Sequence, residues 1–282
     1  MKRFIRTLLC AAAAAAVCSA AWAAGSVELK LLVKPELFAA GRAAGYGQLW
    51  QAIRTEAEKL GMAAEADGDF GEESSEIVRY FDTAAGDLGA KDYTVRQKFK
   101  VKKGTPQAEG ELMLKLRRGA EIAKAERDQF CQGLGHEMKV KYEEDLVGLV
   151  DGVPGKTRSA LSISAKRKNL QSAFGKTVEW LSEYFPTLKG QGLPMDAPLG
   201  LTAAEVLEVG AELGEVKVLG KEEAEMETAV WYDAQTQRLL LVELSWKYKP
   251  AKAAEAEKHR ALFAALQNRT DVFAAGKTKT GK

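Results

Sequence analysis

The sequence predicts an α+β protein built from many antiparallel strands and a few helices, and three observations support this. Apolar and charged residues alternate in several segments, as in residues 95–102 (V-R-Q-K-F-K-V-K), and this period of two is typical of strands with two different faces. Segments with the apolar spacing of helices lie between these strands. The composition, 46% hydrophobic and 28% charged, is that of a globular protein.

The chain begins with the features of a secretory signal peptide. Residues 1–6 are cationic, residues 7–21 are apolar, and Ala21-Trp22-Ala23 fits a cleavage site. We expect residues 1–24 to be removed and the protein to be secreted into the bacterial periplasm. The apolar run is shorter than the about 20 residues that a membrane span needs, and no later segment is apolar enough to cross a bilayer. We therefore expect no membrane span.

The remaining chain is expected to form one domain over residues 25–270, followed by a disordered polar tail at 271–282. Removing residues 1–24 changes the net charge of +2 to a balance of 38 basic against 39 acidic residues, and leaves Cys131 as the one cysteine. A single cysteine forms no internal disulfide, so Cys131 is read as a small buried apolar residue.

The elements follow one another along the chain. Alternation predicts strands at residues 27–30, 95–102, 111–117, 139–145, 162–168, 223–233 and 239–248. Apolar periodicity predicts helices at residues 47–60, 120–130, 170–184 and 253–268. Residues 189–200, rich in glycine and proline, are predicted to be a loop.

Composition excludes several kinds of function. Two His and three Cys are too few for a zinc site rich in these residues, and they leave little room for a Cys/His or Ser/His dyad. A near-neutral charge with interspersed signs argues against a nucleic-acid partner. If the protein is an enzyme, its carboxylates, lysines and arginines carry the chemistry.

The charged strand faces have two interpretations. In the first, they are solvated. In the second, the apolar faces pack outward against helices, and the charged faces line a closed barrel whose crowded lysines and arginines would need anions or carboxylates as partners. Residue spacing alone does not choose between them.

Several strands resemble those of the CYTH domain, or triphosphate tunnel metalloenzyme, family. The similar segments keep the family's order over residues 26–250. They are S-V-E-L-K (26–30), Y-F-D-T (80–83) followed by V-R-Q-K (95–98), L-M-L-K (112–115), K-Y-E-E-D (141–145), A-K-R-K (165–168) and L-V-E-L-S (241–245).

The resemblance implies a closed antiparallel β-barrel, or tunnel, with helices packed outside and a small polyanion such as a triphosphate bound in the lumen. It implies that phosphate oxygens are bound by Lys30, Arg96, Lys98, Lys115, Lys141, Lys166 and Lys168. It implies that Mg²⁺ or Mn²⁺ is held by Glu28, Glu143, Asp145, Asp233 and Glu243. The resemblance also implies that Glu28 and Lys30 are the catalytic residues of a metal-dependent triphosphatase. In such an enzyme the metal polarises the terminal phosphoryl group for attack by water.

Three functions follow from these observations. The first is an exported protein that binds, and hydrolyses with a divalent metal, inorganic tripolyphosphate or polyphosphate. The second is a non-catalytic anion-binding module of the same fold, because Ser26 and Ser245 stand where the family has glutamates. The third is an envelope interaction protein whose charged strand faces meet water. The sequence does not predict the oligomeric state.

Overall fold

The computed structural model describes residues 26–68, 70, 73–119, 121–135, 137–147, 157–218, 222–248 and 253–274. The predicted signal peptide lies outside these residues, as does the predicted tail from residue 275 onward. Within the described part of the chain, no helix is both long and apolar enough to cross a membrane.

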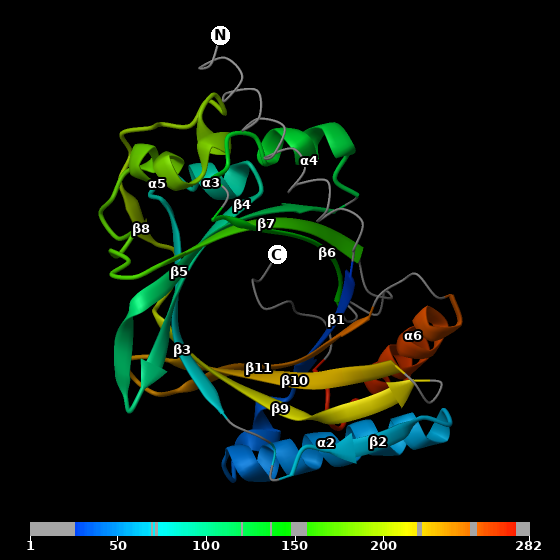
Figure 1. Ribbon diagram of the computed structural model, residues 1–282. Helices are drawn as coiled ribbons and strands as arrows, with labels where there is room; N and C mark the ends of the chain where they lie inside the picture. The colour runs from blue at the N-terminus through cyan, green and yellow to red at the C-terminus, as the bar shows by residue number, and fades with distance from the viewer. Residues whose placement is uncertain are drawn as a thin grey trace. The chain divides into compact units, whose positions relative to one another are not determined.

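Eleven strands form one sheet, in the order β2-β9-β10-β11-β1-β6-β7-β5-β4-β3-β8 (Figure 1). Strand β9 also pairs with β3, so the order of hydrogen-bonded strands returns to itself. The pairs β1–β11, β10–β11, β9–β10, β2–β9, β3–β8, β4–β5 and β5–β7 are antiparallel. The predicted fold class, an α+β protein built on an antiparallel sheet whose strand order closes, with helices packed against it, is confirmed.

The chain divides into two compact units, and strands β3 (Ser74–Thr83) and β6 (Lys139–Val147) pass from one into the other. Unit 1 comprises Ile77–Glu143 and Arg158–Glu205 of the described chain. Unit 2 comprises the described parts of Ser26–Glu76, Glu144–Thr157 and Val206–Lys282.

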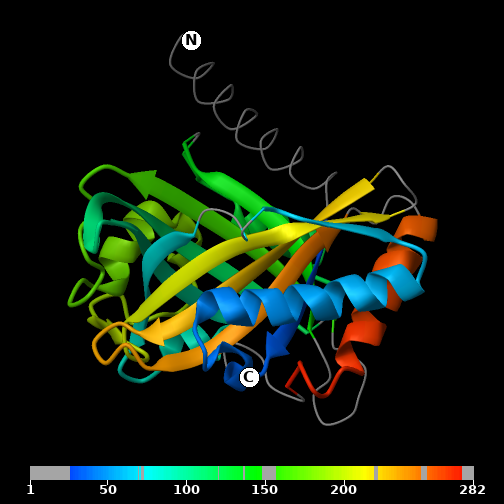
Figure 2. The same ribbon diagram turned by 90° about the horizontal axis from the view of Figure 1, so that it is seen from below.

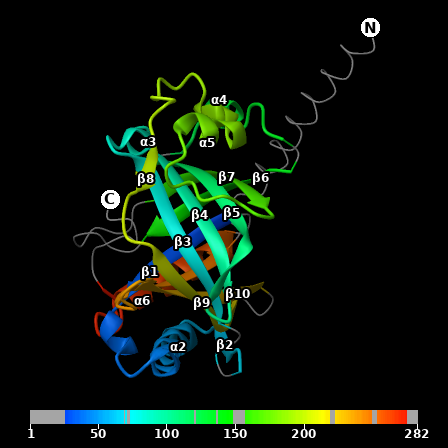
Figure 3. The same cartoon turned by 90° about the vertical axis from the view of Figure 1, so that its left-hand side faces the viewer.

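Unit 1 is a sheet covered on one side by short helices. Its strands, besides its parts of β3 and β6, are β4 (Tyr93–Lys102), β5 (Thr105–Arg118), β7 (Thr157–Arg167) and β8 (Leu199–Leu201). Its helices are α3 (Asp87–Ala90), α4 (Lys124–Phe130), α5 (Val178–Tyr184) and η2 (Pro186–Leu188), and α3, α4 and α5 lie on one side of β4, β5 and β7 (Figures 1 and 3). Leu88, Phe130 and Leu181 of these helices share a core with Val95 and Leu114 of the sheet. The other sheet face is left to polar side chains.

Unit 2 has the same plan with longer helices. Its strands are β1 (Ser26–Val33), β2 (Ala63–Ala66), β9 (Val206–Val218), β10 (Glu222–Asp233) and β11 (Leu239–Tyr248). Its helices are η1 (Pro35–Phe38), α2 (Arg42–Lys59) and α6 (Ala253–Gln267), and Figure 2 shows α2 running along the strands. Trp50 of α2, Phe263 of α6 and Trp246 of β11 belong to one core, which buries the alternate residues of β1, β9, β10 and β11.

Glycine permits a bulge in β9. The register of β9 and β10 shifts between Met226 and Glu227, opposite Gly214, whose φ is 142°. A Cβ at Gly214 would lie 2.3 Å from the backbone oxygen of Glu65, so a side chain does not fit. The bulge interrupts the alternation of β9, which is why residues 206–218 are not predicted as a strand.

The predicted helix over residues 170–184 is wrong in its first half, since α5 begins only at Val178. Residues 171–173 are held instead by the fully buried side chain of Gln97. Its Nε2 donates to the backbone oxygen of Gln171 at 2.7 Å, and its Oε1 accepts from the backbone N–H of Ala173 at 3.3 Å. A partner distant in sequence therefore overrides the local helical spacing.

The predicted domain boundary at residue 270 lies too early. Val272 and Phe273 are buried, and Phe273 forms a β-bridge with Val33. The N–H of Ala274 also donates to the backbone oxygen of Leu32 at 2.9 Å. The folded chain therefore continues at least to Ala274.

Candidate functional site

One face of unit 1 carries cations from three neighbouring strands. Because side chains alternate along a strand, the residues between the core positions of β4, β5 and β7 point away from α3, α4 and α5. The register aligns them in three rows: Thr94–Lys115–Ser162, Arg96–Met113–Ser164 and Lys98–Glu111–Lys166. We call Arg96, Lys98, Lys115 and Lys166, together with Arg117 two residues beyond Lys115 on the same face of β5, the cationic face.

Arg96 lies in the middle row of this face without a carboxylate partner in the described chain. Its Nη2 donates to the sulfur of Met113 at 3.3 Å, and its Nε is buried with no hydrogen-bond partner among the described residues. A thioether is a weak acceptor, so most of the hydrogen-bonding capacity of the guanidinium remains available.

Arg117 and Lys166 are in a similar position. Nη1 of Arg117 donates to Oγ1 of Thr94 at 3.2 Å, and Lys166 is exposed. Neither of them pairs with a carboxylate of the described residues. Arg117 is not among the predicted phosphate-binding residues, although the alternation of residues 111–117 puts it on the same face as Lys115.

Two predicted phosphate-binding lysines meet a predicted metal ligand in unit 1. Glu143 is 5% exposed, and its Oε1 lies 2.5 Å from Nζ of Lys141. Its Oε2 lies 4.0 Å from Nζ of Lys115. The protein's own lysines thus already neutralise this carboxylate.

Lys168 lies beyond the end of β7 in a turn and is exposed. It is not in one of the three rows of the cationic face, and the alternation of β7 ends before it.

The predicted catalytic residues meet in unit 2. Nζ of Lys30 forms ion pairs with Glu28 and, at 3.2 Å, with Asp145, while Glu28 also pairs with Lys247 at 3.2 Å. Burial alone would lower the pKa of Lys30, but the charges of Asp145, Glu28 and Glu243 outweigh it and raise this pKa above its ordinary value. Lys30 is therefore permanently charged and balances the carboxylates beside it.

The sheet register brings Ser245 next to Lys30. Ser245 lies opposite Lys30 of β1 on one side and opposite Glu227 of β10 on the other. Glu243, which is 7% exposed, lies opposite Leu32 and Ala229. The predicted ligands Glu28, Asp145 and Glu243 thus surround one lysine.

Asp233, another predicted metal ligand, lies at the end of β10. Its carboxylate accepts the backbone N–H groups of Gln235 at 3.0 Å and Thr236 at 2.8 Å. The pKa of Asp233 is lowered from its ordinary value, and the backbone hydrogen bond from Thr236 makes the largest contribution. Its interactions are those of a turn residue.

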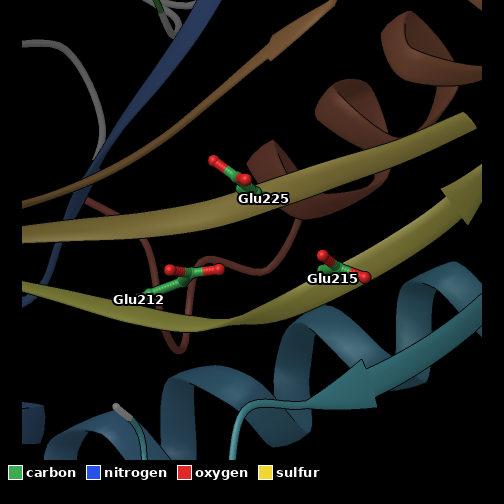
Figure 4. Close-up of side chains that lie close together, drawn as sticks. All are labelled: Glu212, Glu215 and Glu225. Atoms are coloured by element: carbon green, nitrogen blue, oxygen red, sulfur yellow. The ribbon is translucent and has the colours of Figure 1, made fainter. Parts of the chain in front are cut away.

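Three further glutamates of unit 2 come together although no sequence motif singled them out. Figure 4 shows Glu212 and Glu215 on β9 and Glu225 on β10, and their carboxylate oxygens lie within 4.8 Å of one another. Burial, followed by the charge of Glu225, raises the pKa of Glu212; burial, followed by the charge of Glu223, raises that of Glu215. The alternating glutamates at 223, 225 and 227 were visible in the sequence, but their partners lie on the strand that the bulge obscures.

The sequence matches no family model and no curated protein. The structure is similar to several solved structures. A candidate adenylyl cyclase from Hippeastrum with a dominant triphosphatase activity is 14% identical, with a TM-score of 0.44 over 90% of this chain and 92% of that chain. A candidate adenylate cyclase from Bacillus halodurans is 11% identical, with a TM-score of 0.40 over 91% of this chain and 95% of that chain. A protein from Pyrococcus horikoshii is also 11% identical, with a TM-score of 0.37 over 91% and 96%.

All three of these solved structures are less than 25% identical to this chain. Because their TM-scores lie below 0.5, the function proposed below rests on the side chains of this chain.

Proposed function

We propose that the cationic face of unit 1 binds a linear inorganic polyphosphate such as tripolyphosphate. The observation that carries this proposal is the set of three cations, Arg96, Arg117 and Lys166, that share one face without a carboxylate partner in the described chain. Neighbouring cations repel one another and bind water, so a sheet face gains little stability from them unless an anion binds there.

A polyphosphate fits this face better than a single carboxylate does. The guanidinium groups of Arg96 and Arg117 suit bidentate binding of phosphate oxygens, whereas the ammonium groups of Lys98, Lys115 and Lys166 act as point charges. Successive side chains on one face of a strand are about 6.6 Å apart, so the rows can follow a chain of phosphates along the strands.

A phosphate oxygen would also replace the weak acceptor that Arg96 now has. The Met113 sulfur at 3.3 Å is the acceptor that Arg96 uses, and a charged oxygen forms a stronger hydrogen bond. We therefore assign Arg96 the largest share of the binding energy.

A divalent metal, Mg²⁺ or Mn²⁺, belongs to the enzymatic version of the proposal. The predicted ligands Glu28, Asp145 and Glu143 fit it poorly, because lysines already neutralise them. The oxygens of Glu212, Glu215 and Glu225 fit it better, because they lie within 4.8 Å of one another and are hard ligands of the kind that these ions prefer. A divalent ion that accompanies a polyphosphate would supply charge neutralisation and polarise a phosphoryl group.

Lys30 and Glu28, proposed as the catalytic pair, are coupled to each other. Lys30 remains protonated and can hold the Glu28 and Asp145 carboxylates in place by the ion pairs described above.

We propose that the protein is exported to the periplasm, because residues 1–24 have the features of a signal peptide. In that compartment an inorganic polyphosphate suits the proposal better than a nucleoside triphosphate does.

The experiment combines binding and turnover. Tripolyphosphate binding is measured by titration calorimetry, and phosphate release is followed with Mg²⁺ or Mn²⁺. We expect Arg96→Gln to weaken binding about 10- to 100-fold, because it removes a charge-assisted bidentate contact. Lys102→Gln is the matched control, since Lys102 lies exposed on the same strand outside the three rows, and we expect its affinity to be unchanged.

The outcomes separate the parts of the proposal. Equal affinity of wild type and Arg96→Gln contradicts binding by the cationic face. Phosphate release that is lost in Glu28→Ala and Lys115→Ala supports the triphosphatase, whereas full activity in both contradicts it. If Glu215→Gln leaves Mn²⁺ binding unchanged, the glutamate cluster does not hold the metal.

A second function, binding without hydrolysis, is favoured by Ser245. It lies between Lys30 and Glu227, at a place where the resembling family has a glutamate. This version predicts thermal stabilisation by tripolyphosphate without phosphate release. Phosphate release that appears in a Ser26→Glu, Ser245→Glu variant would support it.

A further inference from the structure

The large hydrophobic side chains that unit 1 exposes lie on two segments joined by hydrogen bonds. Phe174, in the segment between β7 and α5, is 63% exposed, and Leu201 of β8 is 41% exposed. The N–H of Gly175 donates to the oxygen of Leu199 at 2.8 Å, and the N–H of Leu199 donates to the oxygen of Lys176 at 2.7 Å. These two bonds bring Phe174 and Leu201 to the same edge of unit 1.

The exposure of Phe174 is imposed by a firmly held backbone. Leu170 and Ala173 on the same segment are buried, and Gln97 binds the backbone at residues 171 and 173. The segment therefore does not fold Phe174 inward, although the aromatic ring would gain free energy from burial.

The segment of the sequence that carries Phe174 is positively charged. Residues 166–176 (K-R-K-N-L-Q-S-A-F-G-K) contain four cations and no carboxylate. Arg167 pairs with Glu137 at 2.9 Å, and the ammonium of Lys176 lies 6.0 Å from the centre of the Trp180 ring. Lys168 is exposed and has no carboxylate partner among the residues that the structure describes. We call Phe174, Leu201, Lys168 and Lys176 the Phe174 patch.

We infer that the Phe174 patch docks on an anionic lipid surface. An aromatic ring held out by a rigid segment can enter the interface of a bilayer, where its apolar body is buried. Lysines beside it attract anionic headgroups, and their long stems allow the charge to stay at headgroup level. The patch uses none of the residues of the cationic face, so this inference does not depend on polyphosphate binding.

A local fluorescence measurement tests this inference. In the full chain, Phe174→Trp adds an indole at the proposed contact, and Lys124→Trp adds one at an exposed position of α4 as the matched control. Each variant is mixed with phosphatidylcholine vesicles, with or without phosphatidylglycerol, that carry brominated acyl chains. We expect the emission added at residue 174 to shift to the blue and to be quenched by vesicles that contain phosphatidylglycerol. The emission added at residue 124 is expected not to change.

The readout is local because the apolar residues 7–21 are present in every variant, and we expect an apolar run to bind lipid independently of the Phe174 patch. Adding Lys168→Gln and Lys176→Gln to Phe174→Trp should weaken the quenching about 30-fold in apparent affinity, since each lysine near an anionic surface contributes on the order of 1 kcal/mol. High salt should weaken it in the same direction.

Three results would overturn the inference. The first is no change at residue 174, and the second is equal quenching by vesicles of phosphatidylcholine alone. The third is relief of the quenching by free tripolyphosphate together with loss of tripolyphosphate binding in Phe174→Ser, which would make the patch part of the polyphosphate site. If tripolyphosphate binding fails in the wild type while residue 174 still enters the bilayer, the lipid inference stands and the proposed function does not.

Discussion

Replacing Arg96 by methionine should affect stability and binding in opposite directions. Methionine keeps an unbranched apolar stem but removes a charge that has no carboxylate partner in the described chain. Lys98 lies two residues along the same strand face, about 7 Å away by strand geometry. At an effective dielectric constant of about 40, two unit charges at that separation repel by about 1 kcal/mol.

We therefore expect Arg96→Met to raise the free energy of unfolding of the ligand-free protein by about 1 kcal/mol and to weaken tripolyphosphate binding about 10- to 100-fold. Urea unfolding at low salt measures the first effect, and titration calorimetry measures the second. High salt should shrink the stability gain, because it screens the repulsion. Lys102→Met is the control and should change neither quantity.

A particular pair of results would refute this reasoning. If Arg96→Met lowers the free energy of unfolding by more than about 1 kcal/mol and leaves the affinity unchanged, Arg96 is a structural residue. The cationic face would then be a solvated sheet surface. We expect the free energy of unfolding to rise and the affinity for tripolyphosphate to fall. This combination is typical of a binding site whose charged residues destabilise the ligand-free protein.

Three further predictions concern the fold. Gly214→Ala should lower the free energy of unfolding by about 3 kcal/mol, because its Cβ would lie 2.3 Å from the Glu65 oxygen. Thermal unfolding should show no comparable loss for Gly119→Ala, where a Cβ meets nothing within 4 Å. Asp82→Ala should cost about 1–2 kcal/mol in urea unfolding, since Asp82 accepts the N–H groups of Thr83, Leu88 and Gly89. Asp82→Asn should cost less because it keeps one oxygen acceptor, and an Asp82→Ala variant as stable as wild type would contradict the assignment. The hydrogen bond with Arg269 lowers the pKa of Asp271 to about 2, so the ionised Asp271 adds to the free energy of unfolding above about pH 4, and this addition is lost as the pH falls through 2. The free energies of unfolding of wild type and Asp271→Asn should therefore converge in acid. A constant difference between them from about pH 7 to about pH 2 would contradict this prediction.

Strand faces could be predicted from the sequence because they depend on a local rule. Alternation assigned Arg96, Lys98 and Lys115 to one side of their strands, and the register bears this out. The predicted strand at residues 239–248 matches β11 in both bounds. Where a period of two continues without interruption, each side chain's face follows from its position alone.

Pairing across strands could not be predicted, because it depends on register. Nothing in the sequence indicates that Lys30 meets Asp145, or that Ser245 lies between Lys30 and Glu227. As a result, carboxylates expected to bind a metal turn out to balance a lysine.

Two local irregularities depart from the sequence-based prediction for the same physical reason. The bulge at Gly214 breaks the alternation of β9 and so hides Glu212 and Glu215, while Gln97 holds residues 171–173 out of a helix. In both cases a contact with a distant segment outweighs the local pattern.

The most direct test of the central claim is an experimental structure of the full chain with tripolyphosphate bound. We predict that phosphate oxygens lie within about 3 Å of the guanidinium groups of Arg96 and Arg117, with Lys166 beside them. An anion bound elsewhere on the molecule, with Arg96 still on the sulfur of Met113, would contradict the proposal.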